Sequence, residues 1–226
     1  MNFSIILDNY DYLLWGAWPN GPLGGAALTL LLSLLSGIAS GVLGLVLGVL
    51  LVMTGPRVQA ALSVGLGFFR AIPVLMLIFW TYFLLPILFG LSIPETATVV
   101  AALSLIGGAY LAHGVAAGLR SLPRGQWDAG LALGLGRWRT LVLVILPQGL
   151  RIMAPSFLNQ WIALVKDTSL AYVIGVPELS FVAAQVNNRA MVYPTEIFLF
   201  VGLVYLVICA SLEALAARIP TAPRAR

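Results

Sequence analysis

Long stretches without a charged residue are the feature that most constrains how this chain can fold. Residues 12–56, 71–94 and 96–119 contain no Asp, Glu, Lys or Arg, and each can hold the roughly 20 apolar residues that cross a bilayer as a helix. Backbone groups in hydrocarbon must be hydrogen-bonded internally, which favours helices. Only 9% of the residues are charged, against about 25% in soluble domains. The sequence therefore predicts an all-α integral membrane protein.

Five membrane spans are predicted from the apolar segments. They cover about residues 24–53, 71–90, 96–119, 152–177 and 197–217. Residues 1–23 then form an N-terminal segment, residues 24–219 form one transmembrane domain, and residues 220–226 form a tail. An odd number of spans places the two ends of the chain on opposite sides of the membrane.

The basic residues predict the orientation of these spans. Short cytoplasmic loops are enriched in Lys and Arg, and ten of the twelve basic residues fall on one predicted side. They are Arg57, Arg70, Arg120, Arg124, Arg137, Arg139, Arg151, Arg218, Arg224 and Arg226. We therefore expect an extracytoplasmic N-terminal segment and a cytoplasmic C-terminal tail.

Glycines in the first span recur at helical spacing. They are Gly37, Gly41, Gly44 and Gly48. Small residues at intervals of three and four lie on one side of a helix and let another helix approach closely. We expect this part of the first span to be a helix-packing surface.

The longest segment between spans, residues 120–151, has more structure than a simple turn. Pro123 indicates a turn, and Asp128 stands near the start of a short helical run, where an acidic side chain suits the helix dipole. Gly134 or Gly136 can end that run in the left-handed conformation. The residues alone leave two interpretations, a helix that lies in a groove of a partner and a re-entrant or interfacial loop.

This loop resembles the EAA motif of ABC-importer permeases, E-A-A-x3-G-x9-I-x-L-P. The spacing is complete, with Asp in place of Glu, Gly in place of the second Ala and Val in place of Ile. In that family the loop forms a cytoplasmic coupling helix that docks into a cleft of the ATP-binding subunit. The resemblance therefore implies coupling to an ATPase through Asp128, Ala129, Gly130, Gly134 and Pro147.

The likeness covers essentially the whole chain. The stretches "FRAIP" (69–73), "KDTSL" (166–170) and "IGVPEL" (174–179) resemble polar amino-acid uptake permeases of the histidine, glutamine, arginine and glutamate family. Within that family, "DTSL" (167–170) and "FVGLVYLVICAS" (200–211) are most similar to glutamate/aspartate permeases. One departure lies near the end of the third span, where the subfamily often has an acidic residue and an Arg three positions later. His113 and Ala116 occupy these two positions here.

The resemblance implies a fold, a location and a set of partners. The fold is the type I ABC-importer transmembrane fold, in the bacterial cytoplasmic (inner) membrane. The partners are a dimer of ATP-binding subunits that carries the ATP and Mg, an extracytoplasmic amino-acid-binding protein, and a second permease subunit in a homodimer or heterodimer. Another polar amino acid or an opine is the alternative cargo.

Two charges interrupt the fourth predicted span. A charge at bilayer depth costs about 2.5–3.5 kcal/mol on insertion scales, and such residues usually have a function. Lys166 and Asp167, with Thr168 and Ser169, line an aqueous path in one interpretation; in the other they pair with each other or with a second subunit. Adjacent helix positions are about 100° apart, so each charge needs a different partner. His113 leaves the same choice, between lining the path and hydrogen bonding across a helix interface.

No motif for independent catalysis is present. The sequence lacks the G-x-x-x-x-G-K-[ST] phosphate loop and the G-x-S-x-G and H-E-x-x-H patterns. One His and one Cys do not make a usual metal site. We expect a transport subunit with no cofactor of its own and no nucleic-acid partner, rather than an enzyme. The rivals are an intramembrane enzyme and a stand-alone secondary transporter or channel. Five spans without an internal repeat argue against the transporter.

Overall fold

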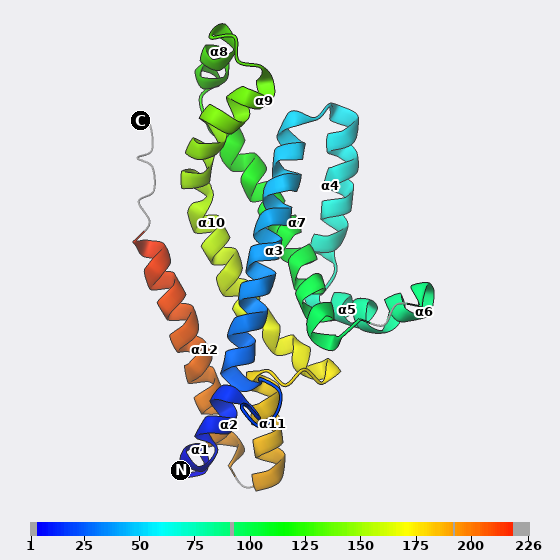
Figure 1. Cartoon of the computed structure of the whole chain (residues 1–226), viewed down its shortest axis with the longest axis vertical. Coiled ribbons are helices and arrows are strands. Elements are labelled where there is room, and N and C mark those ends of the chain that lie inside the picture. Colours follow the sequence, from blue (N-terminus) through cyan, green and yellow to red (C-terminus); the bar gives the residue numbers. More distant parts are fainter. Residues whose placement is uncertain (1–3, 91–92, 192, 219–226) are drawn as a thin grey trace.

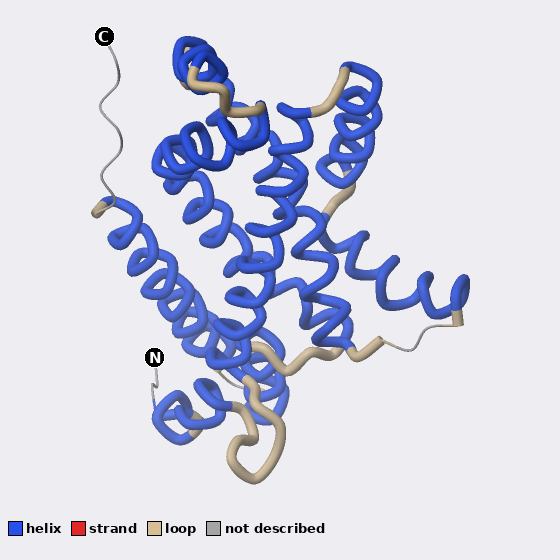
Figure 2. Tube along the Cα trace, turned by 45° about the horizontal axis from the view of Figure 1, so that its top comes forward, coloured by secondary structure: helices blue, strands red, loops and turns tan. Residues whose placement is uncertain are grey.

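The computed structural model describes residues 4–90, 93–191 and 193–218. Over these ranges the secondary structure is helical, and β pairing is limited to two isolated bridges (Figures 1 and 2). The predicted tail, residues 220–226, lies outside the described residues, as do the first three residues of the N-terminal segment. The predicted all-α fold is confirmed.

Within these described ranges, four helices are long and apolar enough to cross a membrane. They are α3 (Gly25–Met53), α7 (Glu95–Arg120), the continuous helix Arg137–Ile174 and α12 (Pro194–Ala217). The continuous helix comprises α9 (Arg137–Thr140), a π-helical turn η2 (Leu141–Ile145), α10 (Leu146–Asp167) and a 3₁₀ segment η3 (Thr168–Ile174). A fifth span results if one bent helix pair is counted as a single crossing.

The bent pair corrects the prediction of a span over residues 71–90. Helix α4 (Pro56–Ala71) runs back alongside α3, and the segment Val74–Phe89 leaves it at an angle of 99°. That segment consists of α5 (Val74–Phe79), the π-helical turn η1 (Trp80–Leu84) and α6 (Leu85–Phe89). The break lies before Pro73, which has no N–H and disfavours the helical conformation at Ile72; Ile72 is extended, with φ −81° and ψ 133°.

The fourth span begins earlier than predicted. The sequence places its start at about residue 152, whereas the continuous helix starts at Arg137. The segment that connects α7 to it therefore ends at Gly136, and Pro147 lies inside the helix. The π-helical turn η2 immediately precedes α10, whose second residue is Pro147. Because proline removes a backbone donor, a locally widened turn lets the helix continue past it.

Helices α3 and α7 form the central pair of the fold. A Cβ atom on Gly48 would lie 2.5 Å from the Cβ of Val115, and one on Gly44 would clash with Leu111. Gly37 and Gly41 face Trp161 and Phe157 of α10 instead. The small residues therefore let two different helices pack against α3, and the predicted helix-packing surface is confirmed.

The end opposite α8 (Arg124–Ala132) and α9 carries shorter helices that the sequence did not predict. They are α1 (Ser4–Asp8), α2 (Tyr10–Trp15) and α11 (Leu179–Ala190), gathered at the foot of α3 and α12 in Figure 1. Helix α11 buries Leu179, Val182, Ala183 and Val186 in a cluster with Ile197 of α12. With 12 residues, α11 is too short to cross a membrane, so a search for membrane spans in the sequence does not find it.

A buried carboxyl joins α11 to the long helices. Glu178 precedes α11, is fully buried, and accepts hydrogen bonds of 2.9 Å from the N–H groups of Ser180 and Phe181. The hydroxyl of Tyr205 on α12 donates to it at 3.0 Å. The N–H of Leu179 donates to Thr29 of α3 at 3.1 Å. Four orphan donors open every helix, and Glu178 satisfies two of them while it contacts α12.

We predict that the stability of this end depends on pH through Glu178. Burial raises the pKa of its carboxyl from 4.5 to about 7, despite the hydrogen bonds that favour the charged form. The folded protein then holds the proton more tightly than the unfolded chain does, so stability falls as the pH rises from about 4.5 to about 7 and is level above that. At about 1.4 kcal/mol per pH unit, the change is on the order of 3 kcal/mol.

The measurement is the unfolding temperature of the full chain in detergent at pH 5 and pH 8. Glu178→Gln keeps an acceptor and does not titrate, so the fall in unfolding temperature from pH 5 to pH 8 should shrink. Asp11→Asn, a change at an exposed carboxyl, serves as the control and should leave the fall unchanged. An identical pH dependence in wild type and Glu178→Gln would refute this assignment.

Candidate functional site

The predicted coupling segment forms a helix that projects from one end of the molecule. Helix α8 (Arg124–Ala132) follows Pro123 and lies beyond the ends of α3 and α4 (Figure 1). This end also carries Arg57, Arg120, Arg137 and Arg139, and we call it the arginine-rich end. Asp128 is the fifth residue of α8, and the first turn contains no acidic residue. The prediction that Asp128 lies near the start of the helix, where it would suit the helix dipole, is therefore wrong.

Gly134 ends α8. Its φ is +77°, a conformation that glycine adopts without a steric cost. The N–H of Gly134 donates to the carbonyl of Leu131 and the N–H of Leu135 to that of Gly130, each at 3.0 Å. This pair of bonds is the Schellman arrangement, which satisfies the last carbonyls of a helix. Of the two predicted glycines, Gly134 has this role, and Gly136 instead precedes α9 in an extended conformation.

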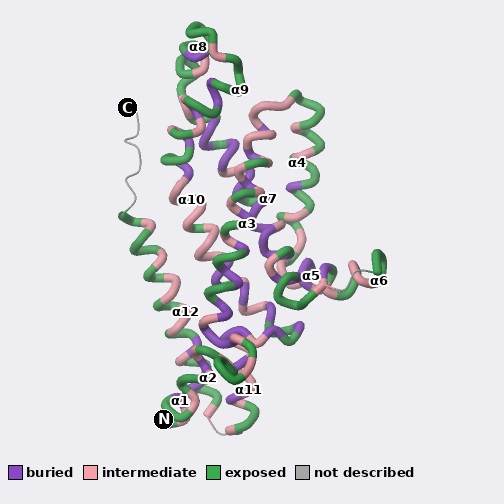
Figure 3. Tube along the Cα trace, viewed as in Figure 1, coloured by how far each residue is buried: buried purple, intermediate pink, exposed green. Residues whose placement is uncertain are grey.

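Contact between α8 and α9 fixes which side of α8 is exposed. Gly130 is buried, and a Cβ atom there would clash with the methyl of Thr140 and lie 2.7 Å from its hydroxyl oxygen. Asp128, Ala129 and Leu133 are exposed, Leu133 to 81%. Figure 3 shows this contrast, with exposed residues along most of α8 and a short buried stretch within it. The exposed side of α8 thus carries small and apolar residues together with Arg124, Gln126 and the carboxylate of Asp128.

The residues predicted to line a path lie at the far end of the long helix from α8. Lys166 is exposed and Asp167 half-buried at the last turn of α10. Thr168 is fully buried, and its hydroxyl donates to the carbonyl of Val165 at 2.7 Å. The hydroxyl of Ser169 donates to the carbonyl of Lys166 at 2.7 Å. Both hydroxyls therefore stabilise the change from α- to 3₁₀-helix, and Lys166 and Asp167 are the members with accessible charge.

His113 lies at a different level from this group. It is half-buried on α7, with its Nδ1 3.3 Å from the carbonyl oxygen of Ala109. The adjacent Gly114 faces Ser156 of α10, and ten residues, roughly 15 Å of helix, separate Ser156 from Lys166. The structure does not bring His113 and Lys166 together.

Arg70 is a charged residue that the sequence assigned to the wrong place. It is fourteen residues beyond Pro56, roughly 21 Å along α4 at 1.5 Å per residue, and so lies far from the arginine-rich end. Its guanidinium lies 5.1 Å from the centre of the Tyr110 ring, and Tyr110 is one turn from His113 on α7. Because the predicted span began at residue 71, the sequence placed Arg70 at the membrane surface. Pro73, three positions later, is the sequence signal for the bend between α4 and α5.

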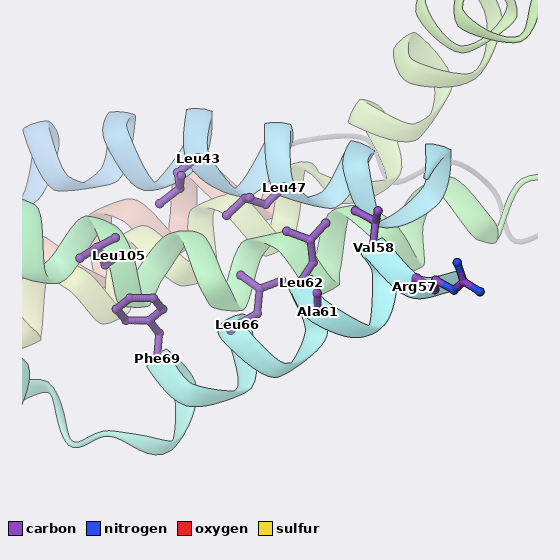
Figure 4. Close-up of a pocket in the computed structure, with 10 residues that line it drawn as sticks. Leu43, Leu47, Arg57, Val58, Ala61, Leu62, Leu66, Phe69 and Leu105 are labelled. Atoms are coloured by element: carbon purple, nitrogen blue, oxygen red, sulfur yellow. The ribbon is translucent and has the colours of Figure 1, made fainter. Parts of the chain in front are cut away.

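An apolar cavity between α3, α4 and α7 does not suit a polar solute. Its volume is about 540 Å³, and Figure 4 shows Leu43, Leu47, Leu62, Leu66 and Phe69 among its lining residues. Arg57 is the one charged residue of the lining, at one end. An amino acid loses its hydration on entering such a space, and burying charge without polar partners is costly.

Comparison with known proteins identifies the family of the chain. Residues 40–224 match the family described as binding-protein-dependent transport system inner membrane component. The chain belongs to this family. Its members are permease subunits of ABC transporters, which pair with ATP-binding subunits, so the expectation of a transport subunit rather than an enzyme is confirmed.

Individual relatives and solved structures agree with this family. The chain is 38% identical over 201 residues to a glutamine transport system permease protein of Escherichia coli K12, covering 86% of this chain and 90% of the relative. It is 37% identical over 154 residues to a glutamate/aspartate import permease protein of E. coli O6:H1, covering 65% and 68%. The fold is similar to that in a crystal structure of an amino acid ABC transporter with histidines. The superposition covers 96% of this chain and 96% of that chain, with a TM-score of 0.82 and 22% sequence identity. This last match supports the type I importer fold.

We predict that Gly130 and Thr140 are coupled in stability. Gly130→Ala places a methyl where the Thr140 side chain lies, and overpacking of this kind costs about 1–3 kcal/mol. Thr140→Ala removes both offending atoms, and the Thr140 hydroxyl has no hydrogen-bond partner to lose. The double variant Gly130→Ala/Thr140→Ala should therefore recover most of the stability.

The measurement is a double-mutant cycle on the unfolding temperature of the full chain in detergent. Gly125→Ala, at an open position on the same helix, is the control and should cause no loss. Additive effects of the two single changes would contradict the contact between α8 and α9.

Proposed function

We propose that this chain is the membrane-spanning subunit of an ATP-driven importer for a polar amino acid. Family membership supports the importer, and the substrate class rests on relatives described as glutamine and glutamate/aspartate permeases. Glutamate or aspartate is our first choice of cargo, and glutamine is the alternative that the relatives support equally. The observation that carries the proposal is the exposed helix α8, held by Gly130 and Gly134 in a chain without a phosphate loop.

In the proposed assembly α8 is the coupling helix. Its exposed residues, Asp128, Ala129 and Leu133, form a narrow surface that fits a groove of an ATP-binding subunit. Gly130 acts indirectly, because it lets α8 lie against Thr140. Pro147 lies inside the long helix and is proposed to transmit movement of α8 into the span. Closure of two ATP-binding subunits on ATP would then displace the arginine-rich end.

The orientation and the remaining partners follow from this arrangement. The arginine-rich end faces the cytoplasm in the bacterial inner membrane, in keeping with the excess of basic residues in cytoplasmic loops. An extracytoplasmic binding protein delivers the amino acid to the opposite end, where α1, α2 and α11 gather. A second permease subunit, identical or related, completes the transporter.

The proposed path for the amino acid is lined by exposed polar and charged side chains of the membrane helices. Arg70, Tyr110 and Lys166 are all exposed in the single chain, although charges at bilayer depth normally face protein or water. A second permease subunit would enclose them around an aqueous path. There the guanidinium of Arg70, lying over Tyr110, can bind a carboxylate of the cargo, and Lys166, Asp167 and His113 contribute at other levels.

We predict that the left-handed turn at Gly134 is needed for coupling. Gly134→Ala forces an L-residue to φ +77°, at a cost of roughly 1–2 kcal/mol, and misplaces the end of α8. Association with the ATP-binding subunit, measured by co-purification from membranes, should fall at least several-fold. Gly136→Ala, two residues away at φ −65° and with open space around it, should associate as wild type does. Equal association of both variants would count against α8 as the coupling helix.

We predict that Arg70 is required for transport. Arg70→Gln removes a charge-assisted contact worth about 1.5–3 kcal/mol, so uptake should fall by at least tenfold. The assay is ATP-dependent uptake of labelled glutamate or glutamine into proteoliposomes that contain the permease, the ATP-binding subunit and the binding protein. Lys166→Ala and Asp167→Ala are tested alongside.

Arg57→Gln, at the other end of the same helix, is the matched control and should keep uptake within about twofold of wild type. Each variant must still co-purify with the ATP-binding subunit, which separates a defect of the path from a defect of coupling. Wild-type uptake by Arg70→Gln, Lys166→Ala and Asp167→Ala would exclude the proposed path and leave the coupling assignment intact.

A further inference from the structure

Three arginines converge on one cavity at the base of α8. The cavity has a volume of about 560 Å³ and is lined by Arg120, Arg124 and Arg137. These residues come from the end of α7, the start of α8 and the start of α9. Val52, in the last turn of α3, completes the lining from the fourth element. The site therefore joins the projecting helix to the two central helices.

Two of the three guanidinium groups are anchored to backbone. Arg120 donates from Nη2 to the carbonyl of Leu51 at 2.8 Å, and Arg137 donates from Nη2 to that of Val52 at 3.3 Å. Carbonyls in the last turn of a helix have no partner within it, so these bonds complete the end of α3. Each guanidinium has five N–H donors, which leaves most of them free to bind a ligand.

This cluster has no direct ion-pair partner in the described part of the chain, and the nearest carboxylate along the sequence is Asp128, one turn after Arg124 on α8. In residues 4–90, 93–191 and 193–218 none of the three arginines lies within ion-pair distance of a carboxylate. Three like charges around one cavity repel each other, and an arginine fork matches the geometry of a phosphate. The cavity is therefore complementary to a phosphate-bearing anion.

The rest of the lining is apolar and selects an amphiphile. Leu119, Leu122, Leu131 and Trp127 form this part of the wall, together with Val52. The carbonyls that anchor the arginines belong to the last turn of α3, where a span of that length ends and lipid headgroups begin. Basic pockets between helices on the cytoplasmic side bind anionic headgroups. A free phosphate ion would bind the arginines but would leave the apolar side chains of the cavity exposed to water.

We propose that this cavity binds the headgroup of an anionic phospholipid from the leaflet at the arginine-rich end. The phosphate lies among Arg120, Arg124 and Arg137, and the glycerol and first acyl carbons lie against the leucines and Trp127. The bound headgroup links α8 to α3 and α7. The site depends on neither the identity of the cargo nor the presence of the ATP-binding subunit.

The test measures lipid retention by the full chain purified in detergent. Native mass spectrometry follows incubation with phosphatidylglycerol or with phosphatidylcholine of the same acyl chains, and the unfolding temperature is recorded with each lipid and with inorganic phosphate. Wild type should retain phosphatidylglycerol and be stabilised by it. Arg124→Gln/Arg137→Gln should weaken retention about thirtyfold, from the attraction of two basic residues near an anionic surface.

Control variants show whether lipid retention depends on the arginines of the cavity or on positive charge in general. Arg139→Gln/Arg151→Gln removes two exposed arginines outside the cavity and should retain phosphatidylglycerol as wild type does. Arg124→Gln alone, at the one cavity arginine without a hydrogen bond to α3, provides a second variant if loss of the Arg137 bond prevents folding. Its expected loss is about fivefold.

Four outcomes would overturn the proposal. These are equal retention of phosphatidylcholine, an equal loss of lipid in Arg139→Gln/Arg151→Gln, and stabilisation by inorganic phosphate that matches stabilisation by phosphatidylglycerol. The fourth is full lipid retention by the cavity variants together with loss of the ATP-binding subunit, which would assign the arginines to an acidic protein surface.

Discussion

Close packing of α3 against α7 is the interaction on which the other helices depend. Gly44 and Gly48 let the backbones approach until Leu111 and Val115 fill the space that side chains on α3 would occupy. In a bilayer there is little hydrophobic drive between helices, so this van der Waals contact holds the pair together. Helices α4 and α10 then pack on the two sides of the pair, and α8 and α9 are placed by the ends of α7 and α10 (Figure 1).

The features that the sequence predicted are those encoded by periodicity and spacing. Long apolar stretches with few charges predicted the long helices. Glycines at intervals of three and four predicted the surface of α3 that packs on α7 and α10. The spacing of the loop residues found α8 and the glycine that ends it. Each of these depends on neighbours along the chain, so local reasoning reaches them.

The features that were missed depend on tertiary context. Pro73 turns an apolar stretch through 99°, which moved Arg70 from the membrane surface to a position beside Tyr110. The fourth span continues past Pro147 because a π-helical turn accommodates the proline. Asp128 could not be placed within α8, since the helix begins at Arg124 rather than at the acidic residue. Thr168 looked like a path residue, yet its hydroxyl is used within its own turn.

The break between α4 and α5 has a mechanical consequence. Ile72 and Pro73 join two helices whose hydrogen bonds are each complete on their own side, since Ile72 donates back to Phe68 and Leu77 donates to Pro73. Rotation about ψ of Ile72 therefore breaks no bond of either helix. The direction of α5 can therefore differ from that of α4 without loss of a hydrogen bond of α4, which holds Arg70 over Tyr110.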